Sequence, residues 1–487
     1  MRLDARGMML AAVAWAFGCQ GDGRGRDSAD GGGIQTGGLD SASMSAGEDA
    51  GDSTATDGSA DAGNDEGADT LKFDVGEMPP PCQNLECDQV VCDDPNVTTT
   101  LTGTVYDPSA TLPLYNVQVY VPNAPVGPLV DDLTCDQCDA ELSGSPLVSA
   151  ITDTEGRFVL ENVPVGANIP LVMQVGKWRR QITVPNVQAC TDNVLADPNL
   201  TRLPRSRAEG DLPRIALTTG GCDPLFCLLR KLGIADEEFG VMGSDARIHF
   251  YRGVNGSSSF NAGFGASPGA TFPTAGSTLW NNGWEGYDIV MLSCECSTEP
   301  SAKNGHRVKM RDYLDAGGRI FSTHYHFNWM QGDAPPDLQS VASFGQEFFD
   351  NGTVTADIDT SFPKGSALAD WMLFVMGSTV HGRFPVTEIR ANTATLGAAA
   401  QQWVYWNTNG ADRTVYFSFN APIGAPEEEQ CGRKVFSDIH VSAAGGNANG
   451  AFPNACNNTP LTPQEKVLIF MLFDLSACIV PDGQPPG

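Results

Sequence analysis

Two neighbouring stretches decide the fold of the C-terminal half of this chain: Tyr287-Asp-Ile-Val-Met-Leu-Ser293 and Gly317-Gly-Arg-Ile-Phe-Ser-Thr-His324. The first contains a continuous apolar run, which is typical of a strand buried on both faces of a parallel sheet. Between them, residues 308–316 have helical apolar spacing and end at a Gly-Gly pair, a helix C-cap signal. A strand, a helix and a second strand in this order predict two parallel neighbours in an α/β sheet.

The rest of residues 210–480 shows the same alternation. Further strands are predicted at Ile215–Thr218, Arg247–Tyr251 and Arg433–His440, and a pair of strands beside the sheet at Trp403–Trp406 and Thr414–Phe419. Asp223 and Pro224 suit the N-cap and the first position of a helix that runs to Leu232. Thr462 and Glu465 form a capping-box pattern that opens a final helix. These signals predict an open, mostly parallel α/β sheet of the flavodoxin-like kind.

Residues 98–204 have a different, all-β pattern. Short runs rich in Val, Ile, Thr and aromatic residues are separated by Pro, Gly, Asn and Asp, which predicts a small β-sandwich. Asp153-Thr-Glu-Gly156 lies between two of these runs and predicts a tight hairpin, in which Gly156 is free to adopt positive φ. We therefore expect a multidomain chain, with a sandwich before the α/β domain.

Parts of this sandwich resemble a known module. Gly103-Thr-Val-Tyr-Asp107, Thr152-Asp153…Gly156-Arg-Phe158 and Val163-Pro-Val-Gly166 are similar to the carboxypeptidase regulatory-like domain. The resemblance implies a transthyretin-like, seven-stranded sandwich without catalytic residues, acting as a spacer or presentation module. An insertion at residues 122–148 departs from the family pattern.

The α/β segment resembles the class I glutamine amidotransferase-like superfamily and, within it, ThuA-like proteins. The resemblance rests on residues 287–324 and on Gly432-Arg-Lys-Val-Phe-Ser-Asp-Ile-His440. In that superfamily the nucleophilic cysteine stands in a Gly-x-Cys-x-Gly elbow after the strand that is here Arg319–Thr323. This chain has Ser-Thr-His-Tyr-His at that place. The resemblance therefore implies a catalytically degenerate domain, which keeps the triad histidine as His440.

Three of the six histidines follow predicted strands of this sheet. His324 and His326 share a face if their strand continues, and His440 closes a parallel strand at the same edge. Neutral imidazoles suit zinc or copper, and Asp438 or Glu295 is an acidic partner that can complete such a site. We name His324, His326 and His440 as candidate catalytic or metal-ligating residues, with zinc as the candidate cofactor.

A carbohydrate site is the second interpretation of the same cluster. Tyr325, Phe327 and Trp329 lie beside the histidines, and aromatic faces stack on sugar rings. The candidate ligand-binding set is His324, His326, His440, Tyr325, Trp329 and Glu295. A third interpretation is that these side chains only fill a vestigial crevice with hydrogen bonds. A Cys294–His440 thiol dyad is a further alternative, although we expect a disulfide at Cys294 in an exported protein.

The N-terminus predicts export. Residues 1–18 have two arginines, a short apolar stretch and Gly18 before Cys19, which is similar to a bacterial lipoprotein signal peptide. We expect Cys19 to be lipidated and the lipid to anchor the chain in a membrane of the cell envelope, with the outer membrane as the expected location. Residues 19–80 then form a Gly/Ser/Asp-rich tether that we expect to be disordered, because 14 acidic and 3 basic residues fall between 20 and 80 with one aromatic.

Export also makes the other thirteen cysteines disulfide candidates. Residues 81–97 are cysteine-rich, and the Cys135-x-x-Cys138 pair lacks the second pair that a zinc ribbon needs, so disulfides are expected there. Since thirteen is odd, at least one cysteine is free or pairs outside the chain. The net charge of −30 excludes a nucleic-acid protein, which needs clustered Lys and Arg.

These features together predict a cell-envelope lipoprotein. Its degenerate amidotransferase-like domain is expected to bind a ligand, with a glycan or cell-wall component as the candidate partner. The alternative function is a hydrolase or metal-dependent enzyme that uses His324, His326 and His440.

Overall fold

A computed structural model describes residues 81–138, 140–441, 449–454 and 456–485. The predicted signal peptide, Cys19 and the acidic tether lie outside these residues. Within the described part, every helix is too short or too polar to cross a bilayer.

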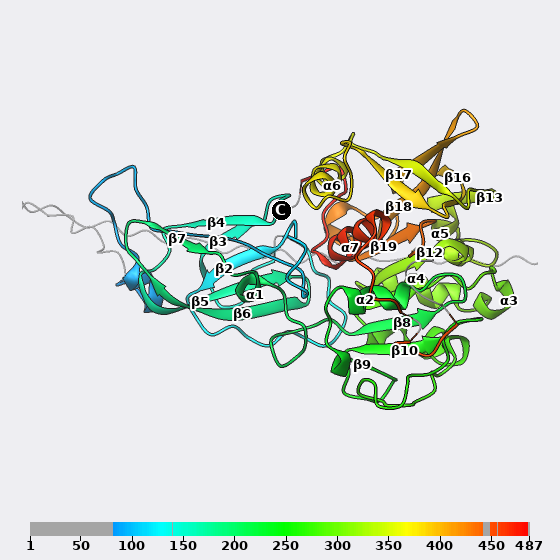
Figure 1. Ribbon diagram of the computed structural model, residues 1–487, viewed down its shortest axis with the longest axis horizontal. Helices are drawn as coiled ribbons and strands as arrows, with labels where there is room; N and C mark the ends of the chain where they lie inside the picture. The colour runs from blue at the N-terminus through cyan, green and yellow to red at the C-terminus, as the bar shows by residue number, and fades with distance from the viewer. Residues whose placement is uncertain (1–80, 139, 442–448, 455, 486–487) are drawn as a thin grey trace, which may run out of the picture. The chain divides into compact units, whose positions relative to one another are not determined.

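Seven strands form a β-sandwich in the first part of the described chain (Figure 1). One sheet has three strands in the order β4-β1-β7, and the other has four in the order β3-β2-β5-β6. Alternating side chains of β4 are buried between the sheets, as expected of strands with one face toward a core. The strands are β1 (Thr100–Thr104), β2 (Gln118–Pro122), β3 (Pro146–Ile151), β4 (Arg157–Glu161), β5 (Gly166–Val175), β6 (Trp178–Val187) and β7 (Asp192–Leu195).

The predicted hairpin at Asp153–Gly156 is wrong, because β3 and β4 belong to different sheets and pair with β2 and β1 instead of with each other, but a tight turn does join them. The Gly156 amide donates to the Asp153 carbonyl at 2.9 Å, and Gly156 has φ 74°. A Cβ at Gly156 would lie 2.7 Å from the Pro113 side chain, so both conformation and space require glycine here. The turn joins strands of different sheets and therefore closes one end of the sandwich.

A ten-stranded mixed sheet forms the second part of the chain. Its order is β15-β14-β17-β18-β19-β12-β11-β8-β10-β9. The strands are β8 (Ile215–Thr219), β9 (Phe239–Gly240), β10 (Ile248–Arg252), β11 (Ile289–Leu292), β12 (Arg319–Thr323), β14 (Thr353–Ile358), β15 (Arg383–Thr387), β17 (Ala400–Thr408), β18 (Ala411–Ala421) and β19 (Gly432–Ser437). A separate antiparallel pair consists of β13 (Ala342–Phe349) and β16 (Arg390–Leu396).

The expectation of a mostly parallel sheet describes only half of it. From β9 to β19 all neighbours are parallel, whereas β19-β18-β17-β14-β15 is antiparallel. The predicted strand pair at 403–406 and 414–419 lies in this sheet rather than beside it. Asn409 and Gly410 make the β17–β18 turn with φ of 53° and 74°, which is the backbone of a two-residue hairpin turn.

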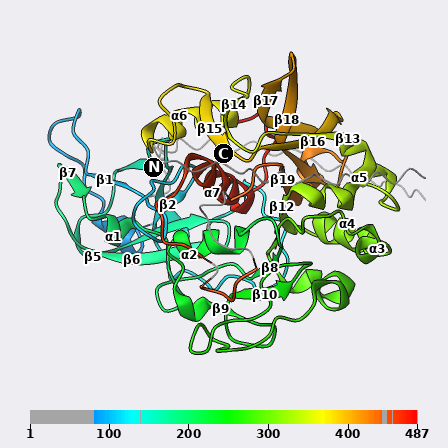
Figure 2. The ribbon, with the colours of Figure 1, turned by 45° about the vertical axis from the view of Figure 1, so that its right-hand side comes forward.

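Helices cover both faces of the sheet (Figures 1 and 2). In β11, Ile289 and Met291 belong to the apolar core shared with α7, whereas Val290 and Leu292 belong to the core shared with α4. This two-sided burial explains the unbroken apolar run in the sequence. The helices are α1 (Pro198–Thr201), α2 (Leu228–Lys231), α3 (Pro300–Lys303), α4 (Arg307–Asp315), α5 (Pro336–Val341), α6 (Pro363–Phe374) and α7 (Pro463–Ser476).

One predicted helix start is confirmed, and the other prediction is wrong. Thr462 caps α7 with the predicted capping box to Glu465. Asp223, by contrast, caps no helix, because a 3-10 turn precedes the short α2. Its buried carboxylate instead accepts hydrogen bonds from Thr323 Oγ1 at 2.7 Å and from the Val441 amide at 3.0 Å.

Six disulfides join the described cysteines, and they include the predicted bonds of the Cys-x-x-Cys pair. Cys135 bonds Cys431 and Cys138 bonds Cys478, so the insertion at 122–148 is tied to the α/β part at two points. The expectation of a disulfide at Cys294 is wrong: it is the free thiol of the described residues and is buried. The other bonds are Cys82–Cys87, Cys92–Cys190, Cys222–Cys296 and Cys227–Cys456.

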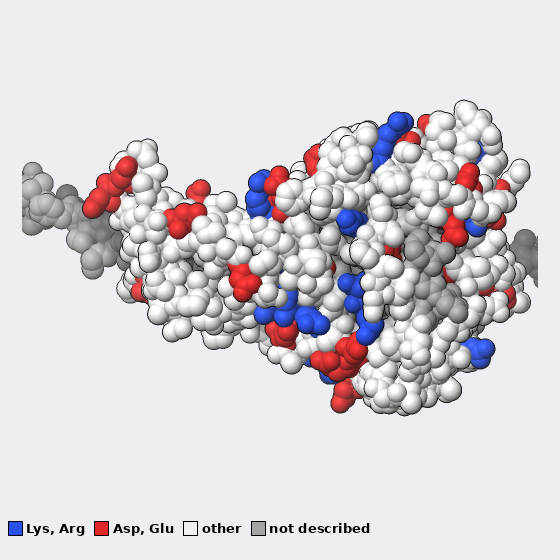
Figure 3. All heavy atoms as spheres, in the orientation of Figure 1, with Lys and Arg blue, Asp and Glu red and all other residues white. Residues whose placement is uncertain are grey.

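Acidic and basic side chains are interspersed on the face seen in Figure 3. The chain forms surface ion pairs such as Arg230–Asp236 at 2.9 Å and Arg247–Asp131 at 2.8 Å. Exposed pairs of this kind contribute about 0–1 kcal/mol each, so the fold depends mainly on its apolar cores.

Candidate metal centre

A sharp turn after β12 places His324 at the carboxyl edge of the sheet. Strand β12 ends at Thr323, and His324 has φ 40°, in the left-handed region that a residue other than glycine enters at a cost of about 1–3 kcal/mol. A 3-10 helix, His324–Met330, follows immediately. The strand therefore does not continue, and the two-residue alternation expected for His324 and His326 does not apply.

Cys294 meets His324 from the neighbouring strand. It follows β11 by two residues, and β11 pairs with β12 in parallel. Its Sγ lies 3.4 Å from His324 Nδ1. The Cys294 amide donates to Thr323 Oγ1 at 3.0 Å, which fixes the backbone of the cysteine against the end of β12.

His440 completes a group of three side chains. It follows β19, the other parallel neighbour of β12, and its ring centroid lies 5.0 Å from that of His324. Cys294, His324 and His440 each offer one ligand atom, and these atoms lie within 4.8 Å of one another. His440 is only 6% exposed, yet its Nε2 has no hydrogen-bond partner among the described residues. A buried nitrogen without a partner is costly, and a bound cation would remove that cost.

A second layer of contacts orients His324. Its Nε2 donates to Asn392 Oδ1 at 2.8 Å, so the Nδ1 lone pair faces Cys294. The backbone N–H of Asn392 in turn donates to Asp438 Oδ2 at 2.9 Å. Metal-ligating histidines are usually held by such a bond from the second ring nitrogen, and this chain of contacts supplies it.

Burial sets the charge state of the three side chains. It lowers the pKa of His324 to about 3 and that of His440 well below its ordinary value, so both imidazoles are neutral near pH 7. Burial likewise raises the pKa of the Cys294 thiol to about 12, although the Tyr325 and Cys296 amides act in the opposite direction. Without a cation the group is thus neutral, and neither Cys294–His324 nor Cys294–His440 is an ionised nucleophilic dyad.

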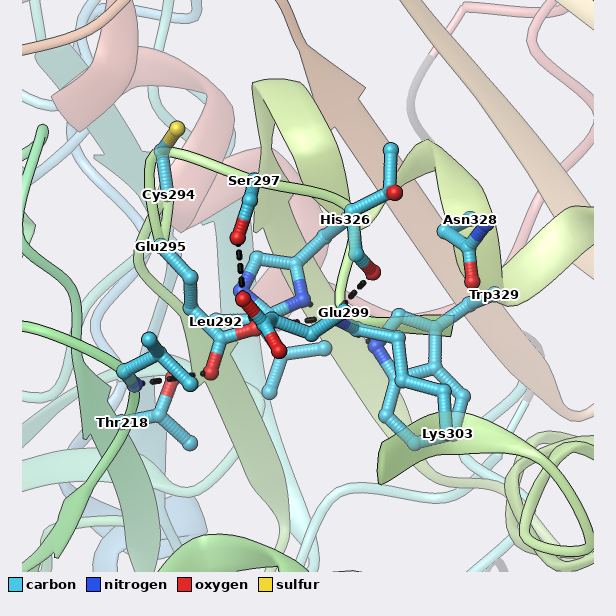
Figure 4. A network of polar contacts seen from close by, with 12 residues as sticks. Thr218, Leu292, Cys294, Glu295, Ser297, Glu299, Lys303, His326, Asn328 and Trp329 are labelled. Carbon is cyan, nitrogen blue, oxygen red and sulfur yellow. Dashed lines mark hydrogen bonds and ion pairs between the residues drawn. The ribbon is translucent and has the colours of Figure 1, made fainter. Parts of the chain in front are cut away.

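His326 belongs to a different network, which Figure 4 shows. Its Nε2 donates to the Ser293 carbonyl at 2.8 Å, and its Nδ1 accepts from Trp329 Nε1 at 3.1 Å. Nearby, Glu295 pairs with Lys303 at 2.7 Å, and both side chains are at most 1% exposed. His326, Trp329 and Glu295 are therefore occupied by one another and by the protein core, and the structure does not bring them to His324 and His440.

Tyr325 lies at the edge of the group. Its ring stacks on His324 with centroids 3.9 Å apart, and its hydroxyl donates to Glu347 Oε2 at 3.1 Å. The three candidate ligands beneath it are 0–6% exposed. Such burial suits an ion better than a sugar ring, which needs contact with an accessible surface.

Asn392 is the residue that sequence reasoning missed. It lies in β16, far from the motifs at 287–324 and 432–440, and no spacing links it to His324. Asp438, which was named as an acidic partner, acts on the backbone of Asn392 and keeps one buried oxygen without a partner in the described structure.

Comparison with known proteins gives no sequence match: no protein family and no curated protein matches the chain. Solved structures with partial likeness include putative ThuA-like proteins from Bacteroides uniformis ATCC 8492 and Parabacteroides merdae ATCC 43184. The first is 8% identical, covers 53% of this chain and 89% of its own, and has a TM-score of 0.31. The second is 10% identical, covers 48% and 82%, and has a TM-score of 0.26.

A cohesin–X–dockerin complex from Acetivibrio cellulolyticus is 17% identical, covers 31% of this chain and 79% of its own, and has a TM-score of 0.15. The expected likeness to ThuA-like proteins thus reappears among solved structures. At these TM-scores it carries no argument about the site.

Proposed function

We propose that the α/β part of this chain binds a zinc ion through Cys294 Sγ, His324 Nδ1 and a ring nitrogen of His440. The observation that carries the proposal is the convergence of these three ligand atoms within 4.8 Å in a buried place. The unpartnered Nε2 of His440 supports it independently. Thiolate and imidazole are the ligands that zinc prefers in proteins.

The surroundings fit such an ion. Both histidines are already neutral, and Asn392 already fixes the tautomer of His324, so little reorganisation opposes binding. The thiol alone must lose a proton, which makes binding pH-dependent. Three protein ligands leave a fourth position, and zinc in such a site supplies Lewis acidity toward a water or a ligand.

The proposal revises the candidate set from His324, His326 and His440 to Cys294, His324 and His440. It also suits a degenerate amidotransferase-like domain, in which the elbow residue after β12 binds a metal instead of attacking a carbonyl. The left-handed backbone of His324 supports this assignment, because an elbow needs that conformation.

Metal analysis of the purified chain tests the proposal. We expect close to one zinc per chain, and cobalt substitution should give a sulfur-to-cobalt charge-transfer band. Cys294→Ser should remove the band, and His324→Ala and His440→Ala should each remove most of the metal. His326→Ala and the exposed His381→Ala are the matched controls, and both should retain it.

Two results would contradict the proposal: folded protein that binds neither zinc nor cobalt, or metal that is lost in His326→Ala but kept in Cys294→Ser. Ester, amide and glycoside libraries then separate the two uses of the site. Turnover that requires metal indicates a hydrolase, whereas bound metal without turnover indicates a ligand-binding or structural role.

We also propose that the chain is an exported envelope lipoprotein anchored through Cys19. The six disulfides support export, because such bonds persist in oxidising compartments. Mass spectrometry of the mature N-terminus is the test, and an unmodified Cys19 would contradict lipidation.

A further inference from the structure

A buried carboxyl group lies beside the proposed metal centre without a cation of its own. Asp223 is 0% exposed, and it forms no ion pair with any described residue. Its two oxygens accept hydrogen bonds from the Thr323 hydroxyl at 2.7 Å and from the Val441 amide at 3.0 Å, and both donors are neutral. A carboxylate in a dry core is costly unless a positive charge lies nearby. A cation bound close to Asp223 would therefore be favourable.

The two donors of Asp223 stand next to two of the proposed ligands. Thr323 directly precedes His324, and Val441 directly follows His440. The same carboxyl group thus holds the ends of β12 and β19 at the points where their histidines begin to face each other.

Cys294, the third proposed ligand, is fixed close to Asp223 as well. Its amide donates to Thr323 Oγ1 at 3.0 Å, and the same hydroxyl donates to Asp223. Cys222, the neighbour of Asp223 in the chain, donates its amide to the Cys294 carbonyl at 3.2 Å and is disulfide-bonded to Cys296. Hydrogen bonds and a disulfide therefore hold the carboxyl group and the thiol in one place.

The charge of Asp223 reaches this thiol without being neutralised. Burial raises the pKa of Cys294 most, and the negative charges of Asp223 and Glu295 raise it further. Glu295 pairs with Lys303 at 2.7 Å, so its charge is compensated locally. Asp223 is left as the acid that can compensate a cation bound to Cys294.

The ligand atoms by themselves do not separate zinc from copper(I), because thiolate and imidazole bind both ions. The charge of the bound group does separate them. Both imidazoles are neutral, and a cysteine binds a metal as thiolate. The thiolate offsets one positive charge, so bound Zn²⁺ leaves one positive charge in the core and bound Cu⁺ leaves none.

We infer that Asp223 is the residue that determines metal specificity at this centre: its carboxylate compensates the charge that Zn²⁺ leaves and thereby favours a divalent ion over Cu⁺. This inference rests on the proposed zinc site. A unit charge several ångströms away changes affinity by about 10- to 100-fold when the effective dielectric constant is about 20. Asp223 should contribute that factor to the binding of zinc and almost nothing to the binding of Cu⁺.

Competition with chromophoric chelators on the full chain measures both affinities, with Cu⁺ kept free of oxygen and of thiol reductants. Asp223→Asn removes the charge at nearly constant size, and its amide can still accept from Val441 and donate to Thr323. Zinc affinity should fall about 10- to 100-fold, and Cu⁺ affinity should stay within about threefold. Asp245→Asn, at an exposed position, is the matched control and should leave both affinities unchanged.

Thr323→Val separates geometry from charge. It removes the hydroxyl that links Asp223 to Cys294 but keeps the carboxylate, so it should weaken both ions by similar factors. Cys294→Ser should weaken both ions strongly, which places them at this centre. Circular dichroism establishes that each variant is folded.

Equal losses of zinc and Cu⁺ affinity in Asp223→Asn would overturn the inference, because Asp223 would then supply geometry and not charge. A larger change in the ratio of the two affinities in Asp438→Asn, the other fully buried carboxyl group near His440, would overturn it too. If the unmodified chain binds no zinc, the proposed function and this inference both fail. If it binds zinc and Asp223→Asn leaves that affinity unchanged, only this inference fails.

Discussion

Asn392 gives the sharpest test of how the proposed zinc site is organised. The side chain lies outside the group of ligands, and its one contact with that group is the 2.8 Å bond from His324 Nε2 to Oδ1. Asn392→Leu keeps a similar volume but offers no acceptor. His324 Nε2 would then lose its 2.8 Å acceptor and keep only the more distant Glu347 Oε1, at 3.6 Å, so the ring would be held less firmly toward Cys294.

The expected loss follows from the kind of bond removed. Loss of a contact that orients a metal-ligating histidine typically reduces metal affinity about 10- to 100-fold, which is about 1.4–2.7 kcal/mol. His324 is only 2% exposed, so water cannot replace the missing acceptor, and we expect the upper half of this range.

Competition with a chromophoric chelator at fixed pH measures the effect. Thr395→Val, an exposed position on the same strand, is the control and should bind zinc like the unmodified chain. If Asn392→Leu is folded and its zinc affinity stays within twofold of the control, the Asn392–His324 bond does not organise the site and the reasoning is refuted.

Three further predictions concern the folded state. Lys434 is fully buried, and burial alone lowers its pKa to about 7. The buried lysine therefore lowers the free energy of unfolding most strongly below pH 7, and this loss becomes smaller as pH rises toward about 10.5. Lys434→Met should raise the free energy of unfolding by up to about 4 kcal/mol at pH 7 and flatten the pH profile measured by urea unfolding, and an unchanged profile would contradict this. Thr462→Ala removes the N-cap hydroxyl that accepts a hydrogen bond from the Glu465 amide, and should lower the free energy of unfolding by about 1 kcal/mol in the same assay. An unchanged urea midpoint would contradict this prediction. Replacing Cys135 and Cys431 together by serine should cost about 2–5 kcal/mol in thermal unfolding, and an unaltered melting temperature under non-reducing conditions would refute a stabilising role for this bond.

Local signals in the sequence were sufficient for much of the fold. The apolar run before Ser293 predicted a strand because a strand covered on both faces needs apolar side chains at successive positions, and β11 has them. The capping box at Thr462 worked for a similar reason, since its contacts span three residues. The prediction that Asp223 caps a helix was wrong because an Asp before a Pro has the sequence pattern of a helix cap. In the structure the buried carboxylate instead accepts hydrogen bonds from Thr323 and Val441.

The cysteine count already required that at least one of the thirteen cysteines after Cys19 has no partner within the chain, because each disulfide uses two cysteines and thirteen is odd. Three-dimensional packing was needed to identify Cys294 as the free cysteine of the described residues and to place it beside His324 and His440 rather than beside His326. The physical reason is that β11, β12 and β19 are spatial neighbours whose carboxyl ends share one edge, although up to 146 positions separate Cys294 from His440 in the chain. Strand order and the left-handed turn at His324 are set by packing over the whole sheet, and no local pattern encodes them.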